Sequence, residues 1–136
     1  AYGAGFETVV ASDLAVAAEG ARLCLPATKL GLTPPLTPDR VVAVGGKKRA
    51  SEIALAGEPI GADTAERWGI INRVVAREEL EEVIEDYVSS IAEADRDALR
   101  VTKERIASAE EGTDETTTER FASEEARARF GDAADG

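Results

Sequence analysis

The chain has 136 residues, and 27 Asp and Glu against 16 Lys and Arg give it a net charge of −11 at pH 7. This charge argues against a nucleic-acid-binding protein, because phosphate contacts need a basic surface. The sequence has no His, which excludes His-based general-base catalysis, Ser-His-Asp triads and His metal centres, and its single Cys excludes an internal disulfide and a Cys-rich zinc site. No apolar run approaches the roughly 20 residues of a membrane span, and no signal peptide is visible. We therefore expect one cytoplasmic domain with no metal and no nucleic-acid or membrane partner.

The charge is unevenly distributed. Residues 1–68 carry 7 basic and 8 acidic side chains, whereas residues 69–136 carry 9 and 19. Such an acidic surface with only 4 Lys is typical of proteins from a high-salt cytoplasm, where carboxylates hold water while salt screens ordinary charges. An ordinary acidic protein is the alternative interpretation. The chain has no Met, even at position 1, so we expect it to be the C-terminal piece of a longer protein.

The first half of the chain predicts short elements separated by Gly and Pro turns. A Glu19-Gly20 turn separates two apolar runs, Gly57 with Pro59 stops a helix, and Asp63 with Glu66 predicts a capping box. In chain order we expect a helix over 6–11, strands over 13–17 and 22–25, a Pro-rich loop over 31–38, helices over 38–44 and 47–56, a short helix over 63–68 and a strand over 70–75.

The second half predicts acidic helices. The clearest helix covers 78–94, because its apolar residues recur at helical spacing and form one stripe opposite a face of carboxylates. The stripe consists of Leu80, Val83, Ile84, Tyr87, Val88 and Ile91. A second helix is expected over 97–109 and a weaker third over 116–130, followed by a frayed tail over 131–136.

The small-residue turn Gly3-Ala4-Gly5 precedes the first helix. It lacks the third Gly of a dinucleotide-binding fingerprint, because Thr8 occupies that position. Close packing, with no room for a larger side chain, is one interpretation. The other is a backbone N–H aimed at an anion, reinforced by the start of the helix.

Other residues also have two interpretations. Glu7 lies on a short, otherwise apolar helix, which indicates either an acid/base group or simple exposure. Cys24 and Trp68 are expected to be packing residues. The run Lys47-Lys48-Arg49 is either a solvated face or a phosphate contact.

The order of the motifs along the chain is more specific than any single motif. The series runs through Gly3-Ala4-Gly5, Glu7, Ala11-Ser12-Asp13-Leu14, Ala21-Arg22-Leu23, Pro26, Lys29-Leu30-Gly31-Leu32, Pro34, Val44-Gly45, Leu55-Ala56-Gly57, Gly69-Ile70-Ile71-Asn72-Arg73-Val74-Val75 and Lys103. This series, from residue 2 to about 106, resembles the crotonase (enoyl-CoA hydratase/isomerase) family.

The resemblance implies an α/β fold. Residues 1–76 would form the C-terminal part of a crotonase-like ββα spiral, and residues 77–136 an acidic, α-helical oligomerisation region. It also implies an acyl-CoA thioester as the partner, a homo-oligomer such as a trimer or hexamer, and no cofactor other than coenzyme A as part of the substrate.

The resemblance also implies site residues. The Ala4 N–H, between Gly3 and Gly5, would be one of two oxyanion-hole donors that stabilise an enolate, the other donor coming from an upstream segment. Glu7 would act as acid/base. The residues that would contact substrate are Gly3, Gly5, Pro26, Ala27, Leu32 and Pro34. Ala27 stands where the family's hydratases carry their second Glu, and it cannot transfer protons.

Two alternatives remain open. One is a truncated or degenerate crotonase-fold remnant that acts as a non-catalytic interaction subunit. The other is an unrelated acidic helical binding domain. Half a spiral would leave strand edges and core uncovered, so we expect poor solubility or association when this chain is expressed by itself.

Overall fold

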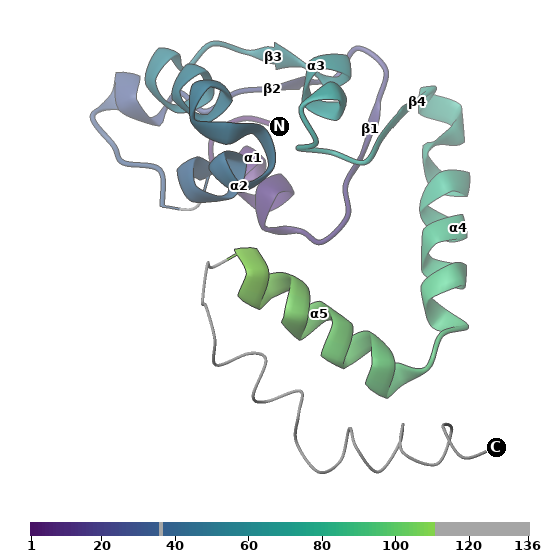
Figure 1. Ribbon diagram of the computed structural model, residues 1–136. Coiled ribbons are helices and arrows are strands. Elements are labelled where there is room, and N and C mark those ends of the chain that lie inside the picture. Colours follow the sequence, from purple (N-terminus) through teal and green to yellow (C-terminus); the bar gives the residue numbers. More distant parts are fainter. Residues whose placement is uncertain (36, 111–136) are drawn as a thin grey trace, which may run out of the picture. The chain divides into compact units, whose positions relative to one another are not determined.

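The computed structural model describes residues 1–35 and 37–110, in two compact units that comprise residues 1–92 and 93–136. The first unit contains α1 (Ala4–Ala11), β1 (Val16–Ala18), β2 (Arg22–Leu23), the 3-10 helix η1 (Ala27–Leu30), α2 (Thr37–Ser51), the π-helix η2 (Glu52–Ala56), β3 (Ile60–Gly61), α3 (Ala62–Arg67), β4 (Arg73–Val75), the 3-10 helix η3 (Arg77–Glu79) and α4 (Leu80–Ala92) (Figure 1). The described part of the second unit contains α5 (Arg96–Glu110). The boundary expected between a spiral core over 1–76 and an oligomerisation region over 77–136 differs from this division into compact units, and it stays a prediction.

Two small sheets connect distant parts of the first unit. Strand β1 pairs in parallel with β4, and β2 pairs antiparallel with β3. Asn72 pins the parallel pair, because its side-chain oxygen accepts the Ala15 N–H at 2.8 Å and its own N–H donates to the Ala15 carbonyl at 2.8 Å. The strand expected over 13–17 is shorter and shifted, at 16–18, and the strand expected over 22–25 is shorter, at 22–23. The sequence did not predict β3.

The core lies where α1 packs against α2. Phe6 and Val41 have no exposed surface, and Leu25, Ile53 and Ala65 are buried beside them. Figure 1 shows α1 and α2 side by side at the centre of the first unit. Burying the Phe6 side chain removes apolar surface from water and contributes roughly 1.5–3 kcal/mol. This packing holds the first turn of α1 in place.

Helix ends follow the glycine signals. The two helices expected over 38–44 and 47–56 meet at Gly46, whose φ of 77° and ψ of 171° interrupt α2. Gly57, with φ 60°, ends η2, as its position after the apolar run predicts. The helix expected over 6–11 is confirmed, and it begins two residues earlier, at Ala4.

The expected capping box of α3 is wrong. The helix begins at Ala62, so its N-cap is Gly61, which has no side chain to accept a hydrogen bond. Glu66 accepts the Val74 N–H at 3.0 Å instead. Sequence spacing assigns the Glu66 carboxylate to the start of α3. In the folded chain it connects α3 to β4, because packing brings it to the Val74 N–H of that strand.

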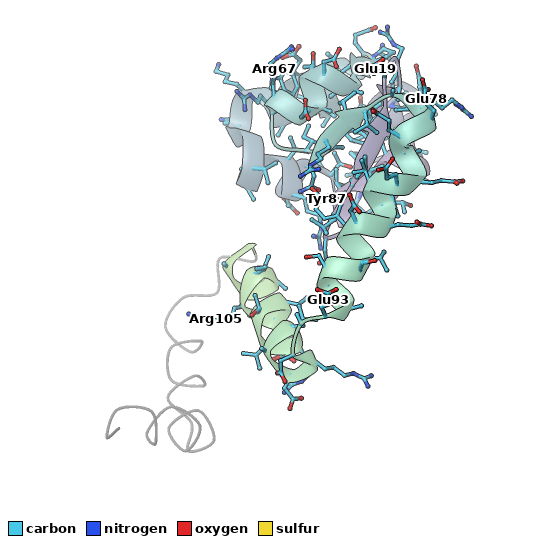
Figure 2. The ribbon with its side chains drawn as sticks, turned by 90° about the vertical axis from the view of Figure 1, so that its right-hand side faces the viewer. Glu19, Arg67, Glu78, Tyr87, Glu93 and Arg105 are labelled. Atoms are coloured by element: carbon cyan, nitrogen blue, oxygen red, sulfur yellow. The ribbon has the colours of Figure 1, made fainter. Side chains whose placement is uncertain are left out.

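Helix α4 confirms the predicted amphipathic stripe, but the stripe is only half covered. Leu80, Val83 and Tyr87 are partly buried, whereas Ile84, Val88 and Ile91 are 44%, 60% and 43% exposed. The Arg73 guanidinium of β4 lies 5.2 Å from the centre of the Tyr87 ring. Tyr87 lies on the side of α4 that faces the strands (Figure 2). Helix α5 matches the helix expected over 97–109. The helix expected over 116–130 and the tail lie outside the described residues.

Candidate active site

The glycine-rich turn at residues 2–5 is held against the end of β2. Tyr2 and Cys24 form a parallel β-bridge, in which the Gly3 N–H donates to the Cys24 carbonyl at 2.9 Å and the Cys24 N–H donates to the Ala1 carbonyl at 3.0 Å. The chain then enters α1 at Ala4. Because the first N–H groups of a helix have no partner within it, Ala4 presents its N–H at the positive end of the helix dipole. No acceptor within residues 1–35 and 37–110 takes this N–H.

Gly3 is needed for the backbone conformation of this turn. Gly3 has φ 54° and ψ −121°, which an L side chain rarely adopts, and a Cβ added to it would meet nothing within 4 Å. A Cβ on Gly5 would make only an ordinary contact with Ala1, at 3.8 Å. The close-packing interpretation of the two glycines is therefore wrong. Gly3 directs the chain into α1 so that the Ala4 N–H lies at the start of the helix.

Glu7 lies one turn into α1 and contacts the start of α2. Its Oε1 accepts a hydrogen bond from the Thr37 hydroxyl at 2.6 Å and another from the Thr37 N–H at 3.3 Å. Glu7 is half-buried, whereas Thr37 is 1% exposed. The carboxylate therefore sits at the N-terminal end of α2, where the helix dipole favours a negative charge. This contact explains why an acid occupies an apolar helix.

The other expected site residues lie on the segment that follows β2. Pro26 precedes η1 and Ala27 is its first residue, both half-buried. Because Cys24 is bridged to Tyr2, these two residues follow directly from the strand that holds the glycine-rich turn. Pro34 is buried, whereas Leu32 is 61% exposed. Ala27 contributes no titratable group, so Glu7 is the one acid among the expected site residues.

The segment around Pro26 is also fixed from the side of η2. A Cβ on Gly57 would come within 3.3 Å of the Leu25 carbonyl oxygen, so a larger residue there would require this segment to move by a few tenths of an ångström. Lys29 Nζ lies 2.5 Å from Glu58 Oε1 in an exposed ion pair. The hydrogen bond and the positive charge of Lys29 lower the pKa of the Glu58 carboxyl below its ordinary value.

Cys24 and Trp68 are packing residues, as expected. Cys24 is 4% exposed, and its Sγ lies 3.4 Å from the Gly57 carbonyl oxygen. The Arg49 guanidinium lies 5.5 Å from the centre of the Trp68 ring. Arg49 thus packs on the core, and only Lys47 and Lys48 of the basic run are exposed. Their role in phosphate contacts stays a prediction.

A surface depression elsewhere does not involve these residues. It is open and lies at the beginning of α4, where Arg77, Glu78, Leu80 and Glu81 line it. Two carboxylates make it a poor match for an anionic ligand. Within the described part of the chain, no helix is long and apolar enough to cross a membrane.

Thr37 is the site residue that sequence reasoning missed. A Thr followed by Pro38 after a proline-rich loop is a helix-start signal, because both residue types favour the first positions of a helix. That signal could have placed Thr37 at the beginning of α2. Its partner, Glu7, is 30 residues away in sequence, and only the packing of α1 on α2 brings the two together.

Comparison with known proteins identifies the family of the chain. The family model described as enoyl-CoA hydratase/isomerase matches residues 1–132. A mevalonyl-coenzyme A hydratase of Aspergillus fumigatus is 39% identical over 105 residues, which make up 76% of this chain and 39% of that protein.

Solved structures give the same result. A Thermobifida fusca protein crystallised in complex with CoA superimposes with a TM-score of 0.82 at 32% identity, covering 100% of this chain and 53% of that one. An enoyl-CoA hydratase from Bacillus anthracis superimposes with a TM-score of 0.73 at 34% identity, covering 79% of this chain and 42% of that one. The chain thus spans about two-fifths to one-half of the length of these relatives. It has the crotonase-like α/β fold and belongs to the enoyl-CoA hydratase/isomerase family.

Proposed function

We propose that this chain carries one side of an acyl-CoA site, in which the Ala4 N–H holds the thioester oxygen and Glu7 moves a proton at the α-carbon. One observation carries the proposal: the N–H at the start of α1 and a carboxylate one turn further along lie on the same short helix, and the carboxylate is held there by Thr37. The CoA complex of the Thermobifida fusca relative supports the substrate class.

In the proposed step, the Glu7 carboxylate takes the proton from the α-carbon of the thioester. The electron pair of the broken C–H bond moves onto the thioester oxygen, which becomes an enolate oxygen. The Ala4 N–H and the positive end of α1 stabilise this charge as it develops. Coenzyme A is needed only as part of the substrate. Because Ala27 provides no second acid, we propose proton transfer by a single acid in preference to hydration by an acid pair.

The test is proton exchange at the α-carbon. The chain is incubated with a saturated acyl-CoA thioester in D₂O, and deuterium incorporation is followed by mass spectrometry. We expect exchange above the buffer rate, and a loss of about 100-fold or more in Glu7→Gln, since positioned acid/base groups contribute about 10²–10⁴-fold.

The matched control is Glu19→Gln, the same chemical change at an exposed turn position (Figure 2). We expect it to leave the exchange rate unchanged. Thioester binding without exchange in the native chain would contradict the enzyme proposal and favour the non-catalytic remnant. The absence of an acid at Ala27 supports that alternative.

We also propose that the chain forms a homo-oligomer, such as a trimer or hexamer, in a salty cytoplasm. The exposed apolar side chains of Ile84, Val88 and Ile91 on α4 support association, and the carboxylates beside them would repel one another less as salt screens them. Light scattering at low and high KCl tests this. Association should increase with salt, and a stable monomer at both concentrations would contradict the proposal.

A further inference from the structure

The contact between Glu7 and Thr37 joins the first turn of α1 to the first turn of α2. Thr37 begins α2, is 1% exposed, and gives both its hydroxyl and its N–H to one oxygen of the Glu7 carboxylate, at 2.6 Å and 3.3 Å. The hydroxyl distance is that of a charge-assisted bond, which is stronger than a neutral one. Two donors on one carboxylate oxygen fix the carboxylate in a single orientation.

An unrestrained Glu would not serve proton transfer well. A free Glu side chain populates many rotamers, and this conformational freedom must be lost each time the carboxylate aligns with a carbon acid. Thr37 is itself immobilised by burial in the first turn of α2, four residues before the core residue Val41. It therefore transmits the rigidity of the α1–α2 core to the Glu7 carboxylate.

We propose that Thr37 is the positioning residue of Glu7: its hydroxyl and its N–H hold the carboxylate in one orientation and aim it at the side of α1 where Ala4 lies. This inference rests on the function proposed above and adds to it a residue that the family comparison does not assign. Thr37 acts through Glu7 and does not itself contact the reacting carbon.

A purely structural role makes a different prediction. If Glu7 only caps α2, then loss of the Thr37 hydroxyl lowers the stability of the fold and leaves the turnover of each folded molecule unchanged. If Thr37 positions Glu7, then turnover falls in molecules that are fully folded. Exchange kinetics, with kcat and KM separated and normalised to the folded fraction by circular dichroism, therefore distinguish the two roles.

The variants are Thr37→Val, which removes the hydroxyl and keeps the shape, and Thr37→Ser, which keeps the hydroxyl. We expect kcat for α-proton exchange to fall about 10- to 100-fold in Thr37→Val with KM within about twofold, because a misplaced catalytic group costs rate more than binding. Thr37→Ser should restore kcat to within about threefold of the native chain.

The matched control is Thr28→Val. The Thr28 hydroxyl donates to the Ala54 carbonyl at 3.0 Å, so this variant also removes a threonine hydrogen bond between two elements, but one that does not reach Glu7. Its kcat should equal that of the native chain. A measurement without any variant at Thr37 guards against misfolding: the Thr37 amide proton should lie downfield in the NMR spectrum of the native chain and move upfield in Glu7→Gln.

The outcomes separate the two proposals. If the native chain exchanges the α-proton and Thr37→Val does so at the native kcat, the positioning role is overturned and the proposed function stands. The positioning role is likewise overturned if Thr37→Ser stays as slow as Thr37→Val in folded protein, or if the Thr37 amide is insensitive to Glu7→Gln. If the native chain and Glu7→Gln exchange no faster than buffer, the proposed function fails, and the role of Thr37 fails with it.

Discussion

Helices α1 and α4 show opposite relations between sequence pattern and burial. Among the described helices, α4 has the most regular apolar stripe, yet none of its residues is buried, and Val88 remains 60% exposed. In α1, a helix of only eight residues without a clear stripe, Phe6 has no exposed surface. Periodicity therefore indicates that a helix forms and which face is apolar. It does not indicate how much of that face the same chain covers.

The difference has a physical origin. A helix becomes buried when other elements surround it, and α1 meets α2 while the bridge at Cys24 holds its start. Helix α4 meets β1 and the strand β4 that precedes it, so one side of its stripe finds partners and the other does not. The functional candidates lie in the region where burial fixes side-chain positions.

The largest expected effect on stability comes from replacing Ile by Ala once in the buried core and once on the exposed side of α4. Ile53→Ala, at a side chain 2% exposed, should lower the free energy of unfolding by about 2–5 kcal/mol, because it leaves a cavity. Ile84→Ala, at a side chain 44% exposed, should cost less than about 1 kcal/mol. Urea unfolding followed by circular dichroism measures both. Equal costs would show that α4 is covered, for example by another copy of the chain.

A glycine pair sharpens the comparison within the first unit. Gly57 and Gly20 both have positive φ, 60° and 75°, but a Cβ would approach the Leu25 carbonyl at the first and nothing at the second. Gly20→Ala should cost about 1 kcal/mol for the strained backbone alone, and Gly57→Ala about 2 kcal/mol or more. Thermal unfolding of both variants tests this. Similar losses would mean that the segment around Leu25 shifts to make room.

A smaller effect concerns the contact that attaches α4 to β4. Tyr87→Leu keeps the apolar bulk of the side chain and removes the ring over which Arg73 lies. A double-mutant cycle with Arg73→Gln should give a coupling of about 0.5–1 kcal/mol, as for an exposed cation–π pair. The same cycle between Tyr87 and the exposed Arg77 should give no coupling. A coupling near zero for Arg73 would mean that apolar contact alone attaches α4.

The smallest effect concerns the exposed pair of Lys29 and Glu58. Lys29 lowers the pKa of the Glu58 carboxyl in the folded chain. The pair therefore contributes stability above the pKa of the unfolded chain, and this contribution is lost as the pH falls through the lowered pKa. Because solvent screens both groups, Glu58→Gln should barely change the melting temperature at pH 7, and the small difference should shrink as acid protonates the Glu58 carboxyl. A large loss at pH 7 would show that the pair holds the segment around Pro26.

Several features of the candidate site follow from local sequence. The small residues before a short helix predict the turn at Gly3, and the single acid on that helix marks Glu7, because an acid among apolar residues needs an explanation. Helix ends at Gly46 and Gly57 are equally local, since a glycine with positive φ stops a helix wherever it lies. The capping box at Asp63 failed for the converse reason: spacing along the chain does not reveal a better partner, such as the Val74 N–H, on another element.

Residue order was sufficient to predict the main helices of the described residues, the apolar face of α4 and the family, because periodicity, turn residues and motif spacing are properties of the chain itself. Only the folded structure identified the hydrogen-bond partners of individual polar groups. Three features depend on elements that are far apart in sequence: the hydrogen bonds from Thr37 to Glu7, the backbone hydrogen bond from Gly3 to Cys24, and the incomplete burial of α4. Such contacts depend on which surfaces bury one another, and burial is decided by the whole fold at once.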